Sequence, residues 1–468
     1  MLQPAPVASL SRVALVAAIG GFLFGYDTAV INGANPYITA HFGLDSMQEG
    51  LAAASAILGC IPGALLGGVI SDRSGRKRVL VLCALLFAIA GIASALPATF
   101  LQFLAARFLG GIAIGISSMV CPVYISECAP AAVRGRLGSL FQLGIVVGIF
   151  LTFFINAGIQ ACGNHAWNES VGWRWMLGAE ALPAAVLLWV LPRAPESPRW
   201  LVQAGRDGEA ARILCGWLEA SAVAEELAAI RGAVATESGR MSELLHRRFR
   251  RPLIIAVGIA VIAQLSGINA VMYYSTKIFI TAGVGMQDAF TATVLIGFVN
   301  LVFTLLAVAL VDRVGRRPLL LAGLVLQTVS LASVAWLLDS HAAGLALLIA
   351  VLTFIASFAI ALGPIPWLLG SEVFPAKIRG RAMSVVSVSV WVACYVVAQT
   401  FPVLNGARAI GPARTFGLYA LVSALGLAFT ALWVPETKGR TLEEIESSWA
   451  TYARGPSDLR GTSTTGSR

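Results

Sequence analysis

Long apolar runs alternate with short polar segments along the whole chain. Twelve of these runs are each roughly 20 residues long, the length with which an α-helix crosses the hydrocarbon core of a bilayer. The pattern therefore predicts an all-α integral membrane protein with twelve transmembrane helices, six on each side of a longer polar segment. The expected spans lie near 13–34, 49–70, 78–97, 100–123, 137–159, 173–192, 252–280, 287–311, 318–338, 342–370, 382–403 and 413–434.

Charged motifs between the apolar runs repeat at a nearly constant offset. Asp-Arg-Ser-Gly-Arg at 72–76 returns as Asp-Arg-Val-Gly-Arg at 312–316, which is 240 positions later. Such a repeat indicates a duplicated membrane bundle, and many transporters are built in this way. Two further motifs repeat in the same order: 127–130 with 134–136 returns at 372–375 with 379–381, and 195–197 returns at 435–437.

The same pattern divides the chain into four parts. Residues 1–192 and 252–434 are expected to form the two six-helix bundles, and 435–468 a largely disordered cytoplasmic tail that ends in Gly, Ser and Thr. The segment 193–251 is predicted to form short amphipathic helices on the cytoplasmic side. It is interpreted either as a latch under the bundles or as a solvated linker. Its helical apolar positions are Ile213, Leu218, Leu227 and Ile230.

Composition supports the bilayer as the main solvent. Charged residues are 12% of the chain, apolar residues 57%, and the mean hydropathy is +0.80. The net charge of +9 reflects short basic clusters after spans 2, 4, 8 and 10. By the positive-inside rule these clusters place both termini in the cytoplasm. Their position between apolar runs is not typical of a nucleic-acid-binding protein. The seven cysteines lack metal or disulfide spacing. No metal, cofactor or enzymatic constellation is therefore expected.

Asp27 is the most informative single residue because it lies deep within span 1. Arg107, within span 4, is the other strong intramembrane charge of this half. Burial favours a protonated carboxyl group, whereas a nearby arginine favours the carboxylate. A carboxyl group under both influences can change its protonation when a small movement changes the distance to its partner. The pair is therefore a candidate proton switch, and a static buried salt bridge is the alternative.

Several motifs together resemble the sugar porters of the major facilitator superfamily, which include bacterial proton-coupled xylose and galactose transporters. The resemblance covers about 13–443 and implies two six-helix bundles around a central cavity that works by alternating access. Besides the two Asp-Arg-x-Gly-Arg loops, it rests on 21–27 (Gly-Phe-Leu-Phe-Gly-Tyr-Asp), 195–201, 264–269 with Tyr273 and Tyr274, 363–367 (Gly-Pro-Ile-Pro-Trp) and 435–439.

The resemblance implies roles for individual residues. Proton symporters of the family carry aspartate at the position of Asp27, whereas uniporters tend to carry a neutral residue. Arg107 matches the partner arginine. Amide and hydroxyl groups at mid-membrane can bind sugar hydroxyls, and an aromatic face can cover the apolar side of the ring. The expected substrate contacts are Gln142, Gln264, Asn269, Tyr273, Asn300, Phe358, Trp367 and Trp391, with interhelical hydrogen bonds and core packing as the alternative for some of them.

Two positions depart from the family pattern. Ala263 stands where the first of two paired glutamines is usual, and Val390 stands where relatives often carry an amide. Two hydrogen-bonding groups are therefore absent, which indicates a substrate with fewer hydroxyl groups to bind or one held in a different pose.

The repeated charged motifs are expected to form a gate on the cytoplasmic side. Their arginines are predicted to pair with glutamates across the two bundles, to hold the inner gate shut and to separate when it opens. A role in membrane insertion alone is the alternative. The gating candidates are Asp72, Arg73, Arg76, Glu127, Arg134, Glu196, Asp312, Arg313, Arg316, Glu372, Arg379 and Glu436.

The sequence thus predicts a transporter that imports a monosaccharide by proton symport. A facilitative sugar uniporter, a proton-coupled polyol or inositol transporter and a membrane sugar sensor are the alternatives. The expected partners are the sugar, the proton and the lipid bilayer, with the monomer as the functional unit. The expected location is the cell membrane, with a bacterial inner membrane preferred.

Overall fold

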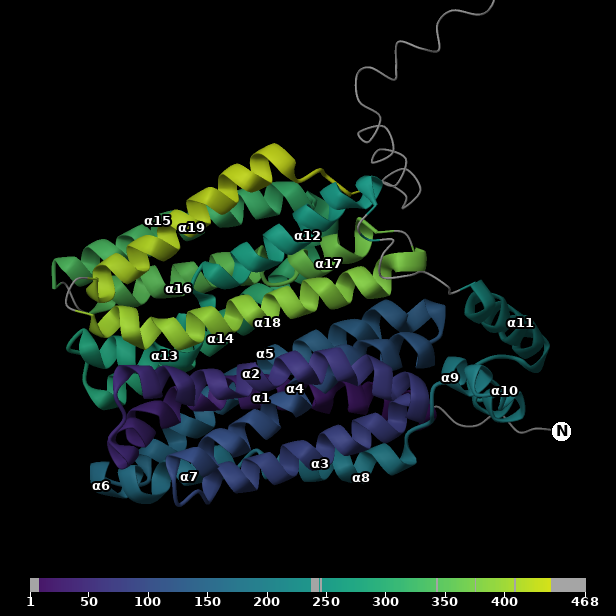
Figure 1. Cartoon of the computed structure of the whole chain (residues 1–468), viewed down its shortest axis with the longest axis horizontal. Helices are drawn as coiled ribbons and strands as arrows, with labels where there is room; N and C mark the ends of the chain where they lie inside the picture. Colours follow the sequence, from purple (N-terminus) through teal and green to yellow (C-terminus); the bar gives the residue numbers. More distant parts are fainter. Residues whose placement is uncertain are drawn as a thin grey trace, which may run out of the picture.

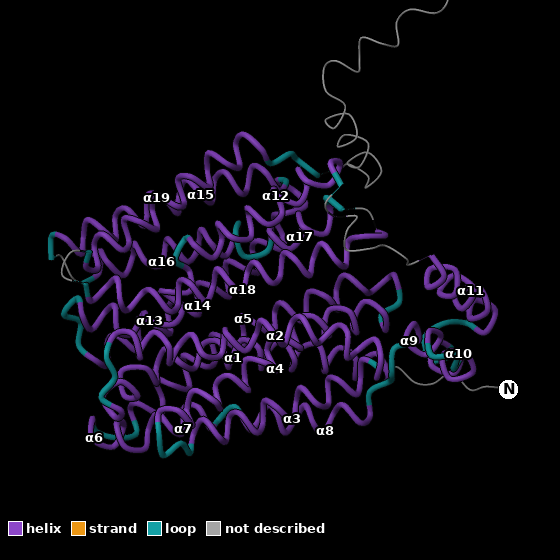
Figure 2. The backbone as a smooth tube through the Cα atoms, viewed as in Figure 1, coloured by secondary structure: helices purple, strands orange, loops and turns teal. Residues whose placement is uncertain are grey.

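The structure, a computed structural model, describes residues 8–236, 244, 246–341, 344–374, 376–407 and 410–438. Within these ranges, twelve helical spans are long and apolar enough to cross a membrane, and the secondary structure is helical throughout (Figure 2). The predicted all-α architecture with twelve spans is therefore confirmed. The predicted tail is described only as far as Lys438, and the rest of it lies outside these residues.

The first six spans form one bundle. Within it α1 packs along α5, and α2 packs along α4. The sixth span begins before the expected position 173, because the helical turns from His165 onward continue into it. The helices are α1 (Ala8–Phe42), α2 (Ser46–Ser74), α3 (Arg76–Ala95), α4 (Phe100–Cys128), α5 (Ala131–Ala161), α6 (His165–Trp167), the π-helix η1 (Asn168–Gly172), α7 (Trp173–Gly178), α8 (Ala181–Val190) and the short η2 (Leu191–Arg193).

Three short helices follow at one end of the bundles, which is called the linker end below; the opposite end, beside α6, is called the far end (Figure 1). They are α9 (Pro198–Gln203), α10 (Asp207–Leu214) and α11 (Ala220–Thr236). A small core of their own, which includes Leu201, Leu214 and Leu227, holds them together. All three helices lie within the segment 193–251.

The remaining spans form the second bundle, which lies beside the first in Figure 1. The two bundles meet where α1 packs on α13, α2 on α18, and α5 on α14. The helices are α12 (Arg247–Leu265), α13 (Ile268–Thr281), α14 (Met286–Val314), α15 (Arg316–Asp339), α16 (Leu345–Ile360), α17 (Ile365–Glu372), α18 (Ala376–Gly406) and α19 (Gly411–Trp433).

Two spans of the second bundle are broken in mid-course. Gly267 adopts a φ of 89° between α12 and α13, in the left-handed region that favours glycine. Pro364 and Pro366 follow α16 and cannot continue its hydrogen-bond ladder, so the helix restarts as α17. The helix of the seventh span is therefore completely interrupted at Gly267. Backbone polar groups become available at both points, and such breaks are tolerated in a membrane where they are enclosed by protein.

The outer surface of the bundles is apolar. Leu101, Leu182 and Leu432 are each more than 70% exposed, and many other large apolar side chains lie on outward faces. Such a surface is unfavourable in water and favourable against lipid tails. Together with the twelve spans, it identifies the chain as a membrane protein.

Candidate functional site

Asp27 and Arg107 meet in the interior of the first bundle. Asp27 lies on α1 with no exposed surface, and Arg107 lies on α4 with 2% of its surface exposed. The Nη1 atom of Arg107 donates to Oδ1 of Asp27, and its Nη2 atom donates to the Asp27 backbone oxygen at 3.1 Å. The sequence thus placed the correct two charges together.

The pair is incompletely satisfied. Among the described residues, Oδ2 of Asp27 and Nε of Arg107 have no hydrogen-bond partner. Gly110 lies against the open oxygen: a Cβ atom at this position would stand 2.8 Å from Oδ2. A buried oxygen without a partner costs about 1–3 kcal/mol or more when charged. A proton or a water molecule bound at Oδ2 would remove this cost.

Glu180 is a third buried charge that the sequence analysis missed. It lies between α7 and α8, is 2% exposed, and has no partner for its Oε1 atom among the described residues. It is close enough to Asp27 and Arg107 to interact with both electrostatically. Glu180 could have been identified from the sequence, because a carboxylate within the sixth apolar run is as unusual as Asp27 within the first.

A small cavity lies at the boundary between the bundles, and Arg107 of the charged pair lines it. Side chains from α1, α2 and α4 line one side, and side chains from α13 and α18 line the other. The lining includes Thr28, Ile57, Cys60, Arg107, Tyr273 and Trp391.

Two predicted substrate residues, Tyr273 and Trp391, contribute to this cavity. Tyr273 is 3% exposed, and its hydroxyl group lies 3.7 Å from Sγ of Cys394. Trp391 packs against the ring of Phe24 from the first bundle, with 5.8 Å between ring centroids. Its indole Nε1–H is buried and has no partner among the described residues. A free indole donor beside an aromatic wall suits a ligand that carries oxygen acceptors.

The break in the seventh span organises two further candidates. Nδ2 of Asn269 donates to Oε1 of Gln264 at 2.7 Å, so the two amides bridge the turn at Gly267. Among the described residues, Nε2 of Gln264 and Oδ1 of Asn269 take no part in this bond and remain as a donor and an acceptor at this point. The left-handed turn brings the two side chains together, although they lie on different helices.

The other predicted contacts lie outside the lining of the cavity. Gln142 on α5 and Phe358 on α16 are partly buried, and Asn300 on α14 is 6% exposed. Trp367 on α17 is 40% exposed and is the least enclosed of the set. The structure therefore gathers only part of the expected substrate set around one cavity. Ala263 and Val390, the two departures from the family pattern, lie in the apolar core of the second bundle.

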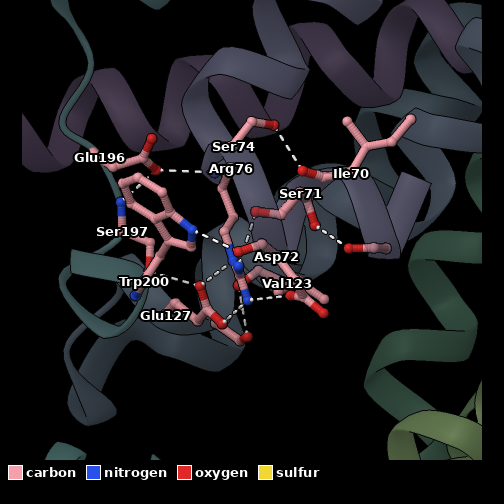
Figure 3. Close-up of polar contacts among 12 residues, drawn as sticks. Ile70, Ser71, Asp72, Ser74, Arg76, Val123, Glu127, Glu196, Ser197 and Trp200 are labelled. Carbon is pink, nitrogen blue, oxygen red and sulfur yellow. Dashed lines mark hydrogen bonds and ion pairs between the residues drawn. The ribbon is translucent and has the colours of Figure 1, made fainter. Parts of the chain in front are cut away.

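The charged motif of the first bundle forms one compact network (Figure 3). Arg76 donates to both carboxylate oxygens of Glu127, at 2.8 and 3.0 Å, and Ser197 donates to the same group at 2.6 Å. The indole nitrogen of Trp200 donates to the backbone oxygen of Asp72 at 2.9 Å, which ties α9 to the end of α2. This network connects α2, α3, α4 and α9 at the linker end.

Glu196 completes the network from the chain that follows η2. Its Oε1 atom accepts the backbone N–H groups of Arg76 and Lys77, both at 3.1 Å, at the start of α3. Negative charge is favourable there because the first backbone N–H groups of a helix lack partners. Gly75 allows this approach: its φ is 97°, and a Cβ atom would stand 2.4 Å from Oε2 of Glu196.

The second bundle repeats the network with its own residues. Arg316 donates to Oε1 of Glu372 at 2.8 Å, and Thr437 donates to Oε2 of the same carboxylate at 2.6 Å. Glu436 accepts the backbone N–H groups of Arg316 and Arg317, both at 3.1 Å. Partial burial raises the pKa of Glu436, but the backbone donors together outweigh it and hold the pKa below its ordinary value.

The predicted pairing across the two bundles is wrong for these networks. Arg76 pairs with Glu127 in the first bundle, and Arg316 pairs with Glu372 in the second. The physical reason is local: helix ends and turns of one bundle converge at each arginine, and two of its side-chain N–H groups donate to the glutamate of the same bundle.

The remaining gating candidates take smaller parts. Asp72 and Asp312 are largely exposed and lie 3.1 Å from Arg76 and Arg316, respectively, four residues later. Arg379 donates to the backbone oxygen of Phe374 at 3.3 Å. Within the described part of the chain, no ion pair is formed by Arg73 or Arg313, and the side chain of Arg134 lies outside that part.

At the far end, polar contacts do join the two bundles. Asn32 on α1 donates to the backbone oxygen of Met272 and to Oγ of Ser275, both at 2.7 Å. Its Oδ1 atom accepts from the hydroxyl group of Thr276 at 2.7 Å. The sequence analysis missed Asn32, whose only signal was an amide within the first apolar run. The bundles are thus fastened at the far end in this conformation.

Comparisons with known proteins agree with this architecture. Residues 13–449 match the family model described as sugar (and other) transporter. The chain is 37% identical over 439 residues to the arabinose-proton symporter of Bacillus subtilis, covering 93% of this chain and 94% of that protein. It is 40% identical over 450 residues to a glucose transport protein of Synechocystis, covering 92% and 95%.

The fold also matches a solved structure over almost its whole length. The partially occluded, inward-open conformation of the xylose transporter from E. coli superposes with a TM-score of 0.83 at 33% sequence identity. The match covers 93% of this chain and all of that chain. Sequence and fold agree, and the chain belongs to the sugar (and other) transporter family.

Proposed function

We propose that this protein imports a monosaccharide together with a proton, by alternating access between its two bundles. The observation that carries the proposal is the buried Asp27–Arg107 pair beside a cavity between the bundles. A transporter without coupling has no need to keep a carboxylate at 0% exposure with one unsatisfied oxygen. The similar arabinose-proton symporter supports the same conclusion.

In this mechanism, Oδ2 of Asp27 is the atom that takes the proton. When Arg107 donates to Oδ1, the carboxylate is stabilised; when a movement of α4 lengthens this contact, burial favours the protonated form. Arg107 also lines the cavity next to Tyr273 and Trp391. A ligand that enters between the bundles here and contacts Arg107 changes the contact of this arginine with Asp27, which links substrate binding to protonation.

The sugar is proposed to bind at mid-membrane, where both bundles contribute. Trp391 supplies an aromatic face and a free indole donor, Tyr273 supplies a hydroxyl group, and the amides of Gln264 and Asn269 supply donors and acceptors at the helix break. The similar proteins transport both a pentose and a hexose by name. A monosaccharide is therefore proposed as the class of substrate. The remaining candidate contacts are Gln142, Asn300, Phe358 and Trp367.

The charged networks are proposed to act in gating by making the linker end of each bundle one rigid unit. Each arginine holds helix ends of its own bundle together, so the bundle moves as a whole. The linker end, with the basic clusters beside it, is proposed to face the cytoplasm of a bacterial cell. One chain supplies both halves of the pathway, so the monomer is proposed as the functional unit.

Uptake by the purified protein in liposomes tests the proposal. A panel of labelled pentoses, hexoses and inositol is offered with and without an inward proton gradient. We expect accumulation of at least one sugar only with the gradient, increased by an inside-negative potential, which supplies about 2.3 kcal/mol per charge per 100 mV. Equal uptake rates with and without the gradient, with no accumulation, would identify a uniporter instead.

The variant Asp27→Asn gives the sharper prediction. Asparagine keeps the shape and one acceptor for Arg107 but takes up no proton, so uphill accumulation is expected to fall to background while sugar exchange continues. The measurement is accumulation under a gradient beside counterflow without one. Undiminished accumulation in this variant is incompatible with Asp27 as the proton site and supports the static salt bridge.

A further inference from the structure

A buried ion pair joins the two bundles at the far end. Lys277 on α13 donates from Nζ to Oε2 of Glu49 on α2. The Glu49 side chain is 3% exposed, whereas the Lys277 side chain is 34% exposed. The Glu49 carboxylate is therefore almost inaccessible to solvent, whereas the Lys277 side chain that binds it is partly exposed. No role has been assigned to this pair in the mechanism proposed above.

The surroundings of Glu49 leave it dependent on the second bundle. Its Oε1 atom accepts from Nδ2 of Asn35 at 2.9 Å, which is a contact within the first bundle. Its charge is balanced only by Lys277 among the described ion pairs. A buried carboxylate that loses its cation is strongly destabilised, and the effect is larger than that of losing an exposed pair.

The internal repeat shows that this pair is one-sided. The offset of 240 residues that relates α2 to α14 places Ala289 at the position of Glu49, and Tyr37 at the position of Lys277. Tyr37 instead stacks on Phe290, the residue after Ala289, with 6.4 Å between ring centroids and an interplanar angle of 29°. An aromatic contact thus stands on one side of the pseudo-symmetric interface, and a charged contact stands on the other.

We propose that Glu49 and Lys277 form an electrostatic latch that holds the far end closed and separates when that end opens. The proposal rests on the alternating access proposed above, because only a bundle movement separates α2 from α13. In the closed state the pair balances a carboxylate that water does not reach. In the open state water enters between the bundles and solvates both charges separately. The latch therefore sets how strongly the closed far end is favoured.

Single and double neutralisations distinguish a latch from ordinary packing. Lys277→Met leaves the Glu49 charge buried without a cation, so the closed state is penalised and the far end opens. Glu49→Gln leaves a neutral amide between Asn35 and a lysine that can reach water, so its effect is smaller. The double variant Glu49→Gln with Lys277→Met has no buried charge, so it returns toward the closed distribution. This order follows from the unequal exposure of the two side chains.

The experiment measures the distance between two spin labels at the far end by pulsed electron paramagnetic resonance. Labels are placed at the exposed positions Ala98 and Gln287, one in each bundle, after replacement of Cys162 and Cys215 by serine. We expect Lys277→Met to raise the ratio of long to short distances at least about tenfold, Glu49→Gln by less, and the double variant to fall between Glu49→Gln and the parent. Tyr37→Phe, which keeps the aromatic contact, is the matched control and is expected to change nothing.

Two outcomes would overturn the latch. One is a distance distribution that is unchanged in both Lys277→Met and Glu49→Gln. The other is a double variant in which the far end opens as far as it does in Lys277→Met. If Lys277→Met does not fold, Glu49→Gln and Lys277→Arg test the latch instead. The latch predicts that the far end opens in Glu49→Gln and stays closed in Lys277→Arg. The distances require neither sugar nor a proton gradient. A failure of the sugar–proton proposal therefore appears in the uptake assay, and a failure of the latch appears in the distances.

Discussion

A single unsatisfied oxygen, Oδ2 of Asp27, is the residue-scale feature on which the proposed coupling depends. The sequence predicted a carboxylate and an arginine in apolar surroundings, and the structure adds which atoms meet. One carboxylate oxygen accepts from Arg107, and the other faces Gly110 with no hydrogen-bond partner in the part of the chain that the structure describes. This split leaves Oδ2 open to take up the proton when the contact between Arg107 and Oδ1 lengthens. It was not readable from the sequence, because it depends on how α4 is rotated against α1.

Glu436 allows a prediction of pH dependence at the same scale. Its pKa is lower in the folded protein than in an unfolded chain, because four backbone N–H groups donate to the carboxylate and outweigh the effect of burial. Its contribution to stability is therefore fully present above its ordinary pKa and is lost as the pH falls through the lowered value. We expect Glu436→Gln to reduce the free energy of unfolding at neutral pH by about 1 kcal/mol, allowing for its partial exposure.

Thermal unfolding in detergent at a series of pH values measures this effect. The difference between parent and Glu436→Gln should be constant from neutral pH down to the ordinary range of a glutamate and should vanish below the lowered pKa. A difference that grows as the pH falls would contradict the argument. Glu226, an exposed glutamate on α11, provides the control variant, and its replacement by glutamine should shift unfolding little at any pH.

At the scale of elements, the broken spans matter most. A continuous helix satisfies its own backbone groups and presents only side chains to a ligand, whereas a broken one also supplies free backbone groups and helix ends. The breaks at Gly267 and at 361–364 both lie in the second bundle. The sequence marked both points through a glycine and two prolines. It did not show that Gln264 and Asn269 would bond to each other across the first break.

The variant Gly267→Ala tests the importance of the first break. A Cβ atom there would stand 2.4 Å from the ring of Tyr419, and its φ of 89° is unfavourable for alanine. Gly283→Ala is a matched control, because its φ of 87° imposes similar backbone strain while nothing lies within 4 Å of the added atom. We expect a loss of about 1 kcal/mol in the control and at least about twice that in Gly267→Ala.

The measurement is the unfolding midpoint of both variants, together with sugar uptake. Uptake should fall in Gly267→Ala and stay near the parent level in Gly283→Ala, because only the first change disturbs the helix break beside the proposed substrate amides. Equal destabilisation of the two variants would show that backbone strain alone accounts for the effect and that the contact with Tyr419 is unimportant.

At the scale of the whole molecule, the two bundles share one plan and differ in their chemistry. The charged networks at Arg76 and Arg316 are near copies, down to the hydroxyl groups of Ser197 and Thr437. The buried Asp27–Arg107 pair lies in the first bundle, and the breaks at Gly267 and at 361–364 lie in the second. The far-end contact is aromatic on one side of the interface and charged on the other.

The variant Glu127→Gln tests whether the networks stabilise individual bundles. Arg76 is nearly buried and loses its bidentate partner, so the free energy of unfolding should fall by about 3 kcal/mol. Glu209→Gln, in an exposed pair with Arg206, should leave it within measurement error. Because the Arg76 pair lies inside one bundle, the far-end spin-label distances should not change. A large change in these distances would instead support the hypothesis that the charged motifs form a gate between the two bundles.

The sequence by itself determined the architecture, because the length of each apolar run and the spacing of the repeated motifs are local properties that the bilayer imposes. It also named the buried charge pair and three of the ten residues that line the cavity, since an unusual residue in an apolar run is conspicuous by itself.

Only the tertiary structure decided which groups meet. Glu180 approaches Asp27, Arg76 pairs within its own bundle, and Glu49 reaches Lys277 in the other. These contacts depend on the rotation and tilt of helices far apart in the chain. Packing against several neighbours at once sets those angles, and no single stretch of sequence encodes them.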